Sequence, residues 1–263
     1  MRGRRRLSAS GEFGKTVVAK GRRGRATPNK GGSDSREPDQ RDACAGRSGR
    51  AVDRRHSGDI YSGSMQSLVE LLAPWGALRS QPLADWRGPP HALPDMVAAF
   101  YRDVGPWGAV VHERVGPVGL TISKGGNPVV VPPLSGLWGL QAGYAWSRDP
   151  DVPLPGWRPN WLVIATDGAN PFMFDRDDGR IHFAFAGRGA AGWQPRLFAH
   201  DLVSGLGAIA TVANSLAELG DDARDDDFDL RPESREYVRG RLAGFLGSAD
   251  RASLALESWK LFA

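Results

Sequence analysis

The stretch between residues 161 and 187, WLVIATDGANPFMFDRDDGRIHFAFAG, places the strongest constraint on the fold. It opens with a continuous apolar run at 161–165, typical of a buried strand, and a second apolar run follows at 171–175. The pair Asp178-Gly179 then predicts a tight turn before 180–186, where apolar and polar residues alternate. Three strands joined by such short connections pair as neighbours, so the stretch predicts an antiparallel β-meander.

Two helical segments are expected before the meander. Between Met65 and Pro74, leucines recur at i, i+3 and i+4, which predicts a short helix that the proline ends. The next segment has Pro94 in its first turn, Asp95 at the positive end of the helix dipole and Gly105 as its terminator. Its broad apolar stripe predicts a helix that packs against a sheet.

Further strands are expected at about 107–115, 119–125 and 127–134, because these runs are short, β-branched and bounded by Gly or Pro. Beyond Pro195 the sequence predicts a long helix from Leu197, followed by an acidic segment and two amphipathic helices at about 233–246 and 249–262. The predicted fold class is therefore α+β, with an antiparallel β-meander sheet packed by helices at both ends of the chain.

Charge divides the chain at residue 64. Residues 1–64 carry 16 Lys and Arg against 7 Asp and Glu, a net charge of +9, whereas 65–263 carry about −5. The first segment contains too few large apolar residues to offset the entropy of ordering it, so we expect a disordered basic leader and a folded domain at 65–263 with a helical extension from about 221. An alternative is that translation begins at Met65.

The composition of the leader and the position of the cysteine indicate where the protein is located and what it can bind. No apolar run follows its arginines, so a secretory signal is not expected. The single cysteine, Cys44, excludes an intramolecular disulfide and suits a cytoplasmic protein, and no run of 18 apolar residues predicts a membrane span. A basic arm for nucleic acid or an anionic membrane stays open, but only for the leader, since the domain itself is acidic.

Enzyme motifs are incomplete. The sequence GLGAIA at 205–210 fits GxGxxA, but no strand is expected before it, as a dinucleotide site requires. The acidic turn at 175–179 has its glycine one position too early for a calcium loop. The histidines lack metal-ligand spacing, so no metal or cofactor is predicted. Folding could bring Asp167 close to His182 or His200 and so form a catalytic pair. The nucleophile would then be Ser135 or Ser204, although neither serine lies in a GxSxG motif.

Two sets of residues are candidates for partner binding. Trp138, Trp146 and Trp157 lie in a Gly- and Pro-rich stretch where surface loops are expected, and exposed aromatic residues are favoured interface anchors. The acidic run contributes Asp221, Asp222, Asp225, Asp226, Asp227 and Asp229. Such a run is typical of a solvated linker, but these carboxylates also fit the basic cleft of a nuclease.

The order of the segments LPDMVAAFYRDVGPWG, WLVIATDGANPFMFDRDDGRIHFAFAG and a helix near Leu197 resembles the SUKH superfamily, the cell-wall-assembly-regulator-like fold. The similarity covers about residues 65–219. The usual glycine run after the central strand is reduced here to Asp167-Gly168-Ala169-Asn170, and the last 40 residues have no counterpart in the family.

This resemblance implies a noncatalytic scaffold that binds a protein. In that family the partner is often a nuclease or deaminase toxin domain from a neighbouring bacterium, so the chain is expected to be a cytoplasmic immunity protein that occludes a toxin's active site. The alternative that the family offers is a regulatory scaffold in cell-wall synthesis or stress response. A hydrolase assembled from scattered Asp, His and Ser residues is the third hypothesis.

Overall fold

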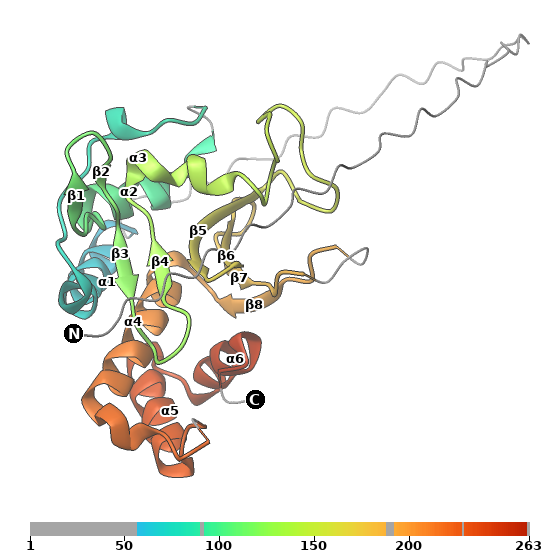
Figure 1. Ribbon diagram of the computed structural model, residues 1–263. Helices are drawn as coiled ribbons and strands as arrows, with labels where there is room; N and C mark the ends of the chain where they lie inside the picture. The colour runs from blue at the N-terminus through green and yellow to red at the C-terminus, as the bar shows by residue number, and fades with distance from the viewer. Residues whose placement is uncertain (1–56, 90–91, 188–191, 228, 262–263) are drawn as a thin grey trace, which may run out of the picture. The chain divides into compact units, whose positions relative to one another are not determined.

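The computed structural model describes residues 57–89, 92–187, 192–227 and 229–261 (Figure 1). The predicted leader falls outside the described residues as far as residue 56, and Cys44 with it. The helices are α1 (Ser57–Leu72), α2 (Asp95–Asp103), α3 (Leu134–Leu137), α4 (Leu202–Leu219), α5 (Pro232–Leu246) and α6 (Ala249–Trp259). The strands are β1 (Val110–His112), β2 (Gly116–Pro117), β3 (Leu120–Ile122), β4 (Val129–Val131), β5 (Trp161–Asp167), β6 (Asn170–Asp175), β7 (Ile181–Phe183) and β8 (Arg196–Ala199).

The α+β class and the antiparallel meander are confirmed. Strands β3 to β8 form one six-stranded sheet in sequential order, and every neighbouring pair is antiparallel. Strands β1 and β2 form a separate two-stranded hairpin. Helices α1 and α2 precede the sheet and α4 to α6 follow it, as expected, but α1 begins at Ser57, eight residues before Met65.

The helix predicted from Leu197 is wrong at its start. Residues 196–199 form β8, which pairs with β7, and α4 begins only at Leu202. Asp201 sets this boundary, because its Oδ1 accepts a hydrogen bond from the Ser204 backbone N–H at 2.8 Å, the geometry of a helix N-cap. A short apolar run has the same pattern in a buried strand as in a buried helix, so periodicity alone did not separate the two.

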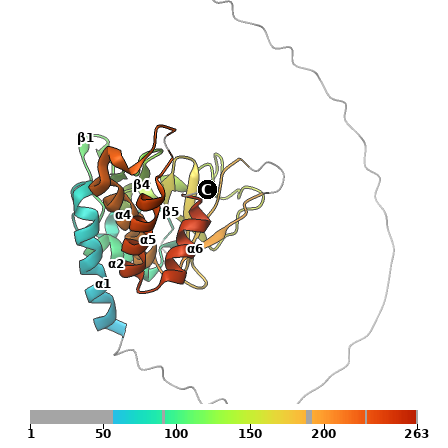
Figure 2. The ribbon, with the colours of Figure 1, turned by 90° about the horizontal axis from the view of Figure 1, so that it is seen from below.

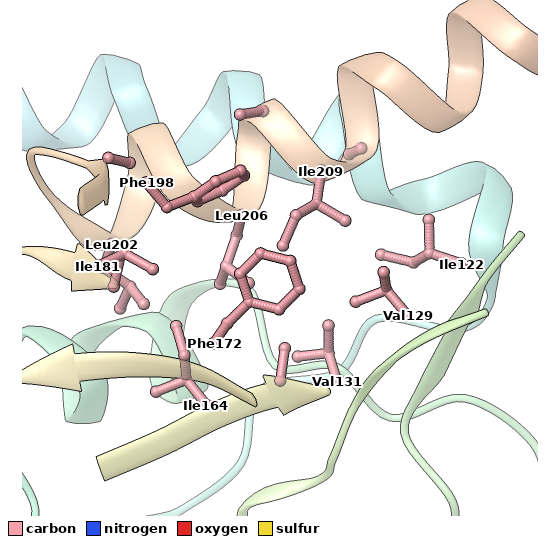
Figure 3. Close-up of a cluster of buried hydrophobic side chains, with 14 of the residues drawn as sticks. Ile122, Val129, Val131, Ile164, Phe172, Ile181, Phe198, Leu202, Leu206 and Ile209 are labelled. Carbon is pink, nitrogen blue, oxygen red and sulfur yellow. The ribbon is translucent and has the colours of Figure 1, made fainter. Parts of the chain in front are cut away.

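Helix α4 lies across one face of the sheet. Its residues Leu202, Leu206 and Ile209 point toward strand residues such as Phe172 and Ile181, and all five side chains are buried (Figure 3). Helices α1 and α5 contact α4, while α6 contacts α5 and β8. Figure 2 shows α4, α5 and α6 together on one side of the strands. This helical layer and the sheet enclose the main hydrophobic core.

The segment Leu202–Ala223 is long and apolar enough to cross a membrane by length and composition, but 72% of its most apolar window is buried inside the protein. The helix it contains is apolar on nearly all sides because the sheet and two other helices surround it. Its composition is therefore that of a core helix.

The opposite face of the sheet carries a second, smaller core. Side chains alternate across β5, so Leu162 faces the main core while Trp161 and Val163 face this one, together with Met173 of β6. Residues between α3 and β5 cover it, including Leu140 and Tyr144. Strands β5 and β6 are thus buried on both faces, and the covering segment contains the tryptophans.

Candidate binding site

Trp138, Trp146 and Trp157 line one cavity of about 580 Å³, and Trp161 of β5 joins them. We call this cavity the tryptophan pocket. Trp138 and Trp146 pack in a tilted arrangement with ring centroids 4.3 Å apart and an interplanar angle of 43°, and Trp157 meets Trp161 edge to face at 5.4 Å. The structure therefore brings together the three tryptophans that the sequence analysis singled out.

Their exposure differs from the expectation of surface loops. Trp146 and Trp157 keep only 7% and 8% of their surface exposed, whereas Trp138 is partly buried. The stretch between α3 and β5 folds back on the sheet and packs Trp138 against Trp146 and Trp157 against Trp161, since large aromatic side chains gain most from burial. The rings form walls instead of protruding anchors.

Gln141 fixes this wall to the sheet. Its side chain is fully buried, and it donates from Nε2 to the Val163 carbonyl and accepts at Oε1 from the Val163 N–H, both at 2.9 Å. Strand β4 pairs with β5 only at Thr166 and Asp167, so Gln141 takes the place of a neighbouring strand further along β5. Nε2 also donates to Leu137, which ties α3 to the same point.

Arg176 supplies the cation of the pocket. Its guanidinium donates to the carbonyl of Ala92 from Nε at 3.2 Å and from Nη2 at 2.9 Å, and to the carbonyl of Pro159 from Nη1 at 2.6 Å. No carboxylate pairs with it among the residues that the structure describes. Burial lowers the pKa of Arg176, but an arginine remains a cation at neutral pH.

One donor in the pocket wall lacks an acceptor. The Trp157 indole N–H is buried, and within the described part of the chain it has no hydrogen-bond partner. A buried donor without an acceptor is costly, and most buried indole N–H groups find one. Neither Arg176 nor Gln141 was singled out from the sequence, because an isolated arginine in a turn and a glutamine in a glycine-rich stretch carry no motif.

The aspartates of the acidic run lie elsewhere. Asp221 and Asp222 belong to a short 3₁₀ turn, η7 (Gly220–Ala223), and both are exposed, as are Asp225, Asp226, Asp227 and Asp229. Arg224 within the run donates to the Gly125 carbonyl at 2.7 Å, in the turn between β3 and β4. Helix α3, directly before the pocket-lining residue Trp138 in the chain, lies at the other end of β4 (Figure 1). The two candidate sets therefore do not form one site.

Two of the residues considered for catalysis, Asp167 and Ser204, have structural partners. Asp167 accepts a hydrogen bond from Trp259 Nε1 at 2.7 Å and pairs with Lys124 at 3.2 Å, which joins α6 to the sheet. The Ser204 hydroxyl donates to Asp201 at 2.7 Å, within the cap of α4. Neither His182 nor His200 contacts Asp167 in any hydrogen bond or ion pair of the described residues.

The two glycines of GLGAIA allow α4 to pack closely against its neighbours. They lie inside α4, where a Cβ on Gly205 would come 2.8 Å from Ile181 and one on Gly207 would come 2.1 Å from Phe245. The preceding strand β8 is antiparallel to β7, and the Asp201 carboxylate occupies the helix N-terminus where a dinucleotide would place its phosphates. The motif is thus a close-packing device.

Within the described residues, folding assembles one possible metal-ligand group that the sequence did not reveal. Asp175, Asp178 and His182 each offer an atom within 4.8 Å of the others, across the β6–β7 turn. Burial lowers the pKa of His182, which favours the neutral form that binds metals. However, Asp175 already accepts from Asn160 at 2.7 Å, and Arg180 lies 3.6 Å from Asp178, so both carboxylates have competing partners.

No protein-family model matches this chain, and no curated protein or solved structure matches it. The resemblance to the SUKH superfamily therefore depends on the sequence motifs alone.

Proposed function

We propose that this protein is a noncatalytic binding protein of the SUKH type, which works in the bacterial cytoplasm and neutralises a cognate toxin domain by covering the toxin's active site. The tryptophan pocket is its contact surface. The observation that carries this proposal is the pocket itself: four tryptophan rings around a cavity of about 580 Å³, within the size range of specific binding sites. Tryptophan and arginine are the residues most enriched among those that dominate binding energy.

The rigidity of the pocket supports the same function. Gln141 attaches its wall to β5, and Arg176 ties the segments at Ala92 and Pro159 to the end of β6. A preformed surface loses little conformational entropy when a partner docks, so more of the contact energy appears as affinity. Because the acidic run lies at the other end of β4, we assign it to electrostatic steering of a basic partner instead of to the contact itself.

The test is growth rescue by the full-length chain. Toxin domains recovered by affinity capture from the native host are expressed with and without this protein, and rescue is expected for the cognate one. Capture of envelope-synthesis proteins without any rescue would contradict immunity and favour the regulatory scaffold.

Two adjacent substitutions test the pocket as the contact surface. Pro153 lines the pocket, whereas its neighbour Val152 does not and is 60% exposed. Pro153→Glu should abolish rescue and Val152→Glu should preserve it, although both add the same charge to the same loop. Rescue by Pro153→Glu, or its equal loss in both variants, would show that the pocket is not the contact surface.

A further inference from the structure

Two properties of the tryptophan pocket define what it accepts. The rings of Trp138, Trp146, Trp157 and Trp161 offer apolar walls, and Arg176 offers a cation with no carboxylate partner among the described residues. An apolar group satisfies the walls, and a negatively charged acceptor pairs with Arg176. The occupant therefore combines the two.

Arg176 has donors left for such an anion. Its three hydrogen bonds use one N–H on each of its nitrogens, whereas a guanidinium carries five N–H groups in a planar fork. The two carbonyl partners hold the fork in place without neutralising it. Carboxylates match this geometry better than single-point anions do, because they accept two parallel hydrogen bonds.

Among its described lining residues, the pocket contains one negative charge, Asp151. This residue is exposed, so water and salt screen its carboxylate, whereas Arg176 is partly buried and is screened less. The balance inside the pocket therefore favours an anion, and Asp151 lowers the affinity for it slightly.

The walls also determine how a peptide can enter. Four lining residues are prolines, Pro89, Pro150, Pro153 and Pro159, which have no backbone N–H to donate. An internal peptide segment would bury peptide groups on both sides of its apolar residue with few partners, at a substantial cost. A C-terminal residue brings one peptide group and places its carboxylate beside its own side chain. Arg176 donates a hydrogen bond to the carbonyl of Pro159, which lies between Trp157 and Trp161 in the chain. The cation is therefore close to the aromatic walls, as the carboxylate and the side chain of one C-terminal residue require.

We infer that the tryptophan pocket binds the C-terminal residue of the partner protein, with its apolar side chain between the tryptophan rings and its carboxylate on Arg176. This inference rests on the proposed binding function and deepens it by naming the partner's chemistry. A carboxylate accepted here pairs with the Arg176 guanidinium.

The probes are N-acetyl-phenylalanine, which ends in a carboxylate, and its neutral amide, N-acetyl-phenylalaninamide. Titrated into the full-length chain, the acid should quench tryptophan fluorescence saturably, with a Kd on the order of 1 mM for so small a ligand. The amide should bind about tenfold more weakly, because it loses the charge-assisted pair. Equal affinity for the acid and the amide would overturn the inference.

Substitutions separate the charge from the fold. Arg176→Gln should remove the preference for the acid, and Arg176→Lys should retain part of it, since lysine keeps the charge but not the fork. Asp151→Asn should strengthen binding of the acid about twofold, because it removes the opposing charge. Arg176 also holds two loop carbonyls, so thermal unfolding of each variant identifies loss of the fold; Asp151→Asn leaves these bonds intact and tests the charge balance even where Arg176→Gln unfolds.

Failure of this inference and failure of the proposed function are distinguishable. Rescue from a toxin with no preference between acid and amide would leave the immunity function standing and refute the C-terminal ligand. A clear preference for the acid without any rescue would leave the carboxylate site standing and refute toxin neutralisation.

Discussion

Gln141 shows how one buried polar side chain can determine the shape of the candidate site. Replacing Gln141 with leucine keeps a side chain of similar size but leaves the N–H and C=O of Val163 without their side-chain partners. Each unsatisfied buried group costs about 1–3 kcal/mol, so Gln141→Leu should lower the free energy of unfolding by at least about 2 kcal/mol. Gln66→Leu, at an exposed position of α1, is the control and should change it by less than about 0.5 kcal/mol in urea unfolding.

His182 makes stability depend on pH. Burial in the sheet lowers the pKa of its imidazole, although Asp175 and Asp178 partly oppose the shift. The folded state therefore binds this proton less readily than the unfolded chain, whose histidine pKa is about 6.5. Its stabilising contribution is complete above that value and declines as the pH falls from there toward the folded pKa.

The corresponding measurement is urea unfolding at pH 7.5 and pH 5.5. The free energy of unfolding of the wild type should fall between these values more than that of His182→Asn, which carries no titrating group at this position. Equal losses in the two proteins would show that His182 does not contribute to the pH dependence. His200→Asn, at an exposed position next to the cap of α4, is the matched control substitution, for which the same two measurements are made.

At the scale of elements, close packing of α4 on the sheet requires glycine. A methyl group at Gly205 would lie 2.8 Å from the Cγ1 atom and 3.3 Å from the Cβ atom of Ile181 on β7, and β-branched residues on strands adjust poorly. Gly205→Ala should therefore lower the free energy of unfolding by about 1–3 kcal/mol despite the better helix propensity of alanine. Gly240→Ala in α5 should raise it by up to about 1 kcal/mol, because nothing lies near that position.

Sequence patterns predicted elements well where one face or both faces of an element are apolar over a long stretch. The strands at 161–187 and helices α5 and α6 agree with their predicted ranges within a few residues. Strand β8 was not predicted, because its four residues continue the apolar pattern of α4 and are compatible with a strand or with a helix. Only the pairing with β7 decides between them, and pairing between distant segments is not encoded in local periodicity.

Because local sequence patterns do not encode contacts between distant segments, only part of the candidate site could be predicted. The three tryptophans were identifiable from the sequence because a segment rich in glycine and proline predicts loops, and aromatic residues on loops are favoured in binding sites. Arg176 and Gln141 complete the pocket from positions that follow β6 and α3, and no short sequence window contains both. The cluster of Asp175, Asp178 and His182 likewise depends on the β6–β7 turn bringing its members together.

At the scale of the whole molecule, one buried ion pair connects the C-terminal helix to the far edge of the sheet. Lys124 follows β3, Asp167 ends β5, and Trp259 of α6 donates to the same carboxylate. Asp167→Asn leaves the ammonium of Lys124 uncompensated, so it should lower the free energy of unfolding by about 3–5 kcal/mol. Lys124→Met should lower it by a similar amount, because it leaves the Asp167 carboxylate without its cation. In the double variant the losses should be clearly less than additive in a urea-unfolding cycle, whereas additive losses would show that the pair does not couple.

The distribution of charge over the molecule leads to the last prediction. Six exposed aspartates are concentrated between α4 and α5, on a folded domain that is acidic overall. If they steer a basic partner, the association rate should fall as salt rises, and replacing all six with asparagine should remove most of this dependence while changing the dissociation rate little. The local turn should survive, because Asp225 Oδ1 accepts from the N–H groups of Asp227 and Asp229, as an asparagine oxygen also can.

A control with the same change in net charge distinguishes the run from the overall charge. It neutralises six exposed carboxylates elsewhere in the described domain: Glu70, Glu113, Asp149, Glu236, Asp250 and Glu257. Screening confines exposed charges to a range of about 8 Å at physiological salt, so scattered carboxylates should steer far less than a cluster does. Stopped-flow association with the cognate partner should slow much more for the run variant than for the control. Equal slowing would mean that overall charge acts alone, and no slowing in the run variant would leave the aspartates as a solvated connection between two helices.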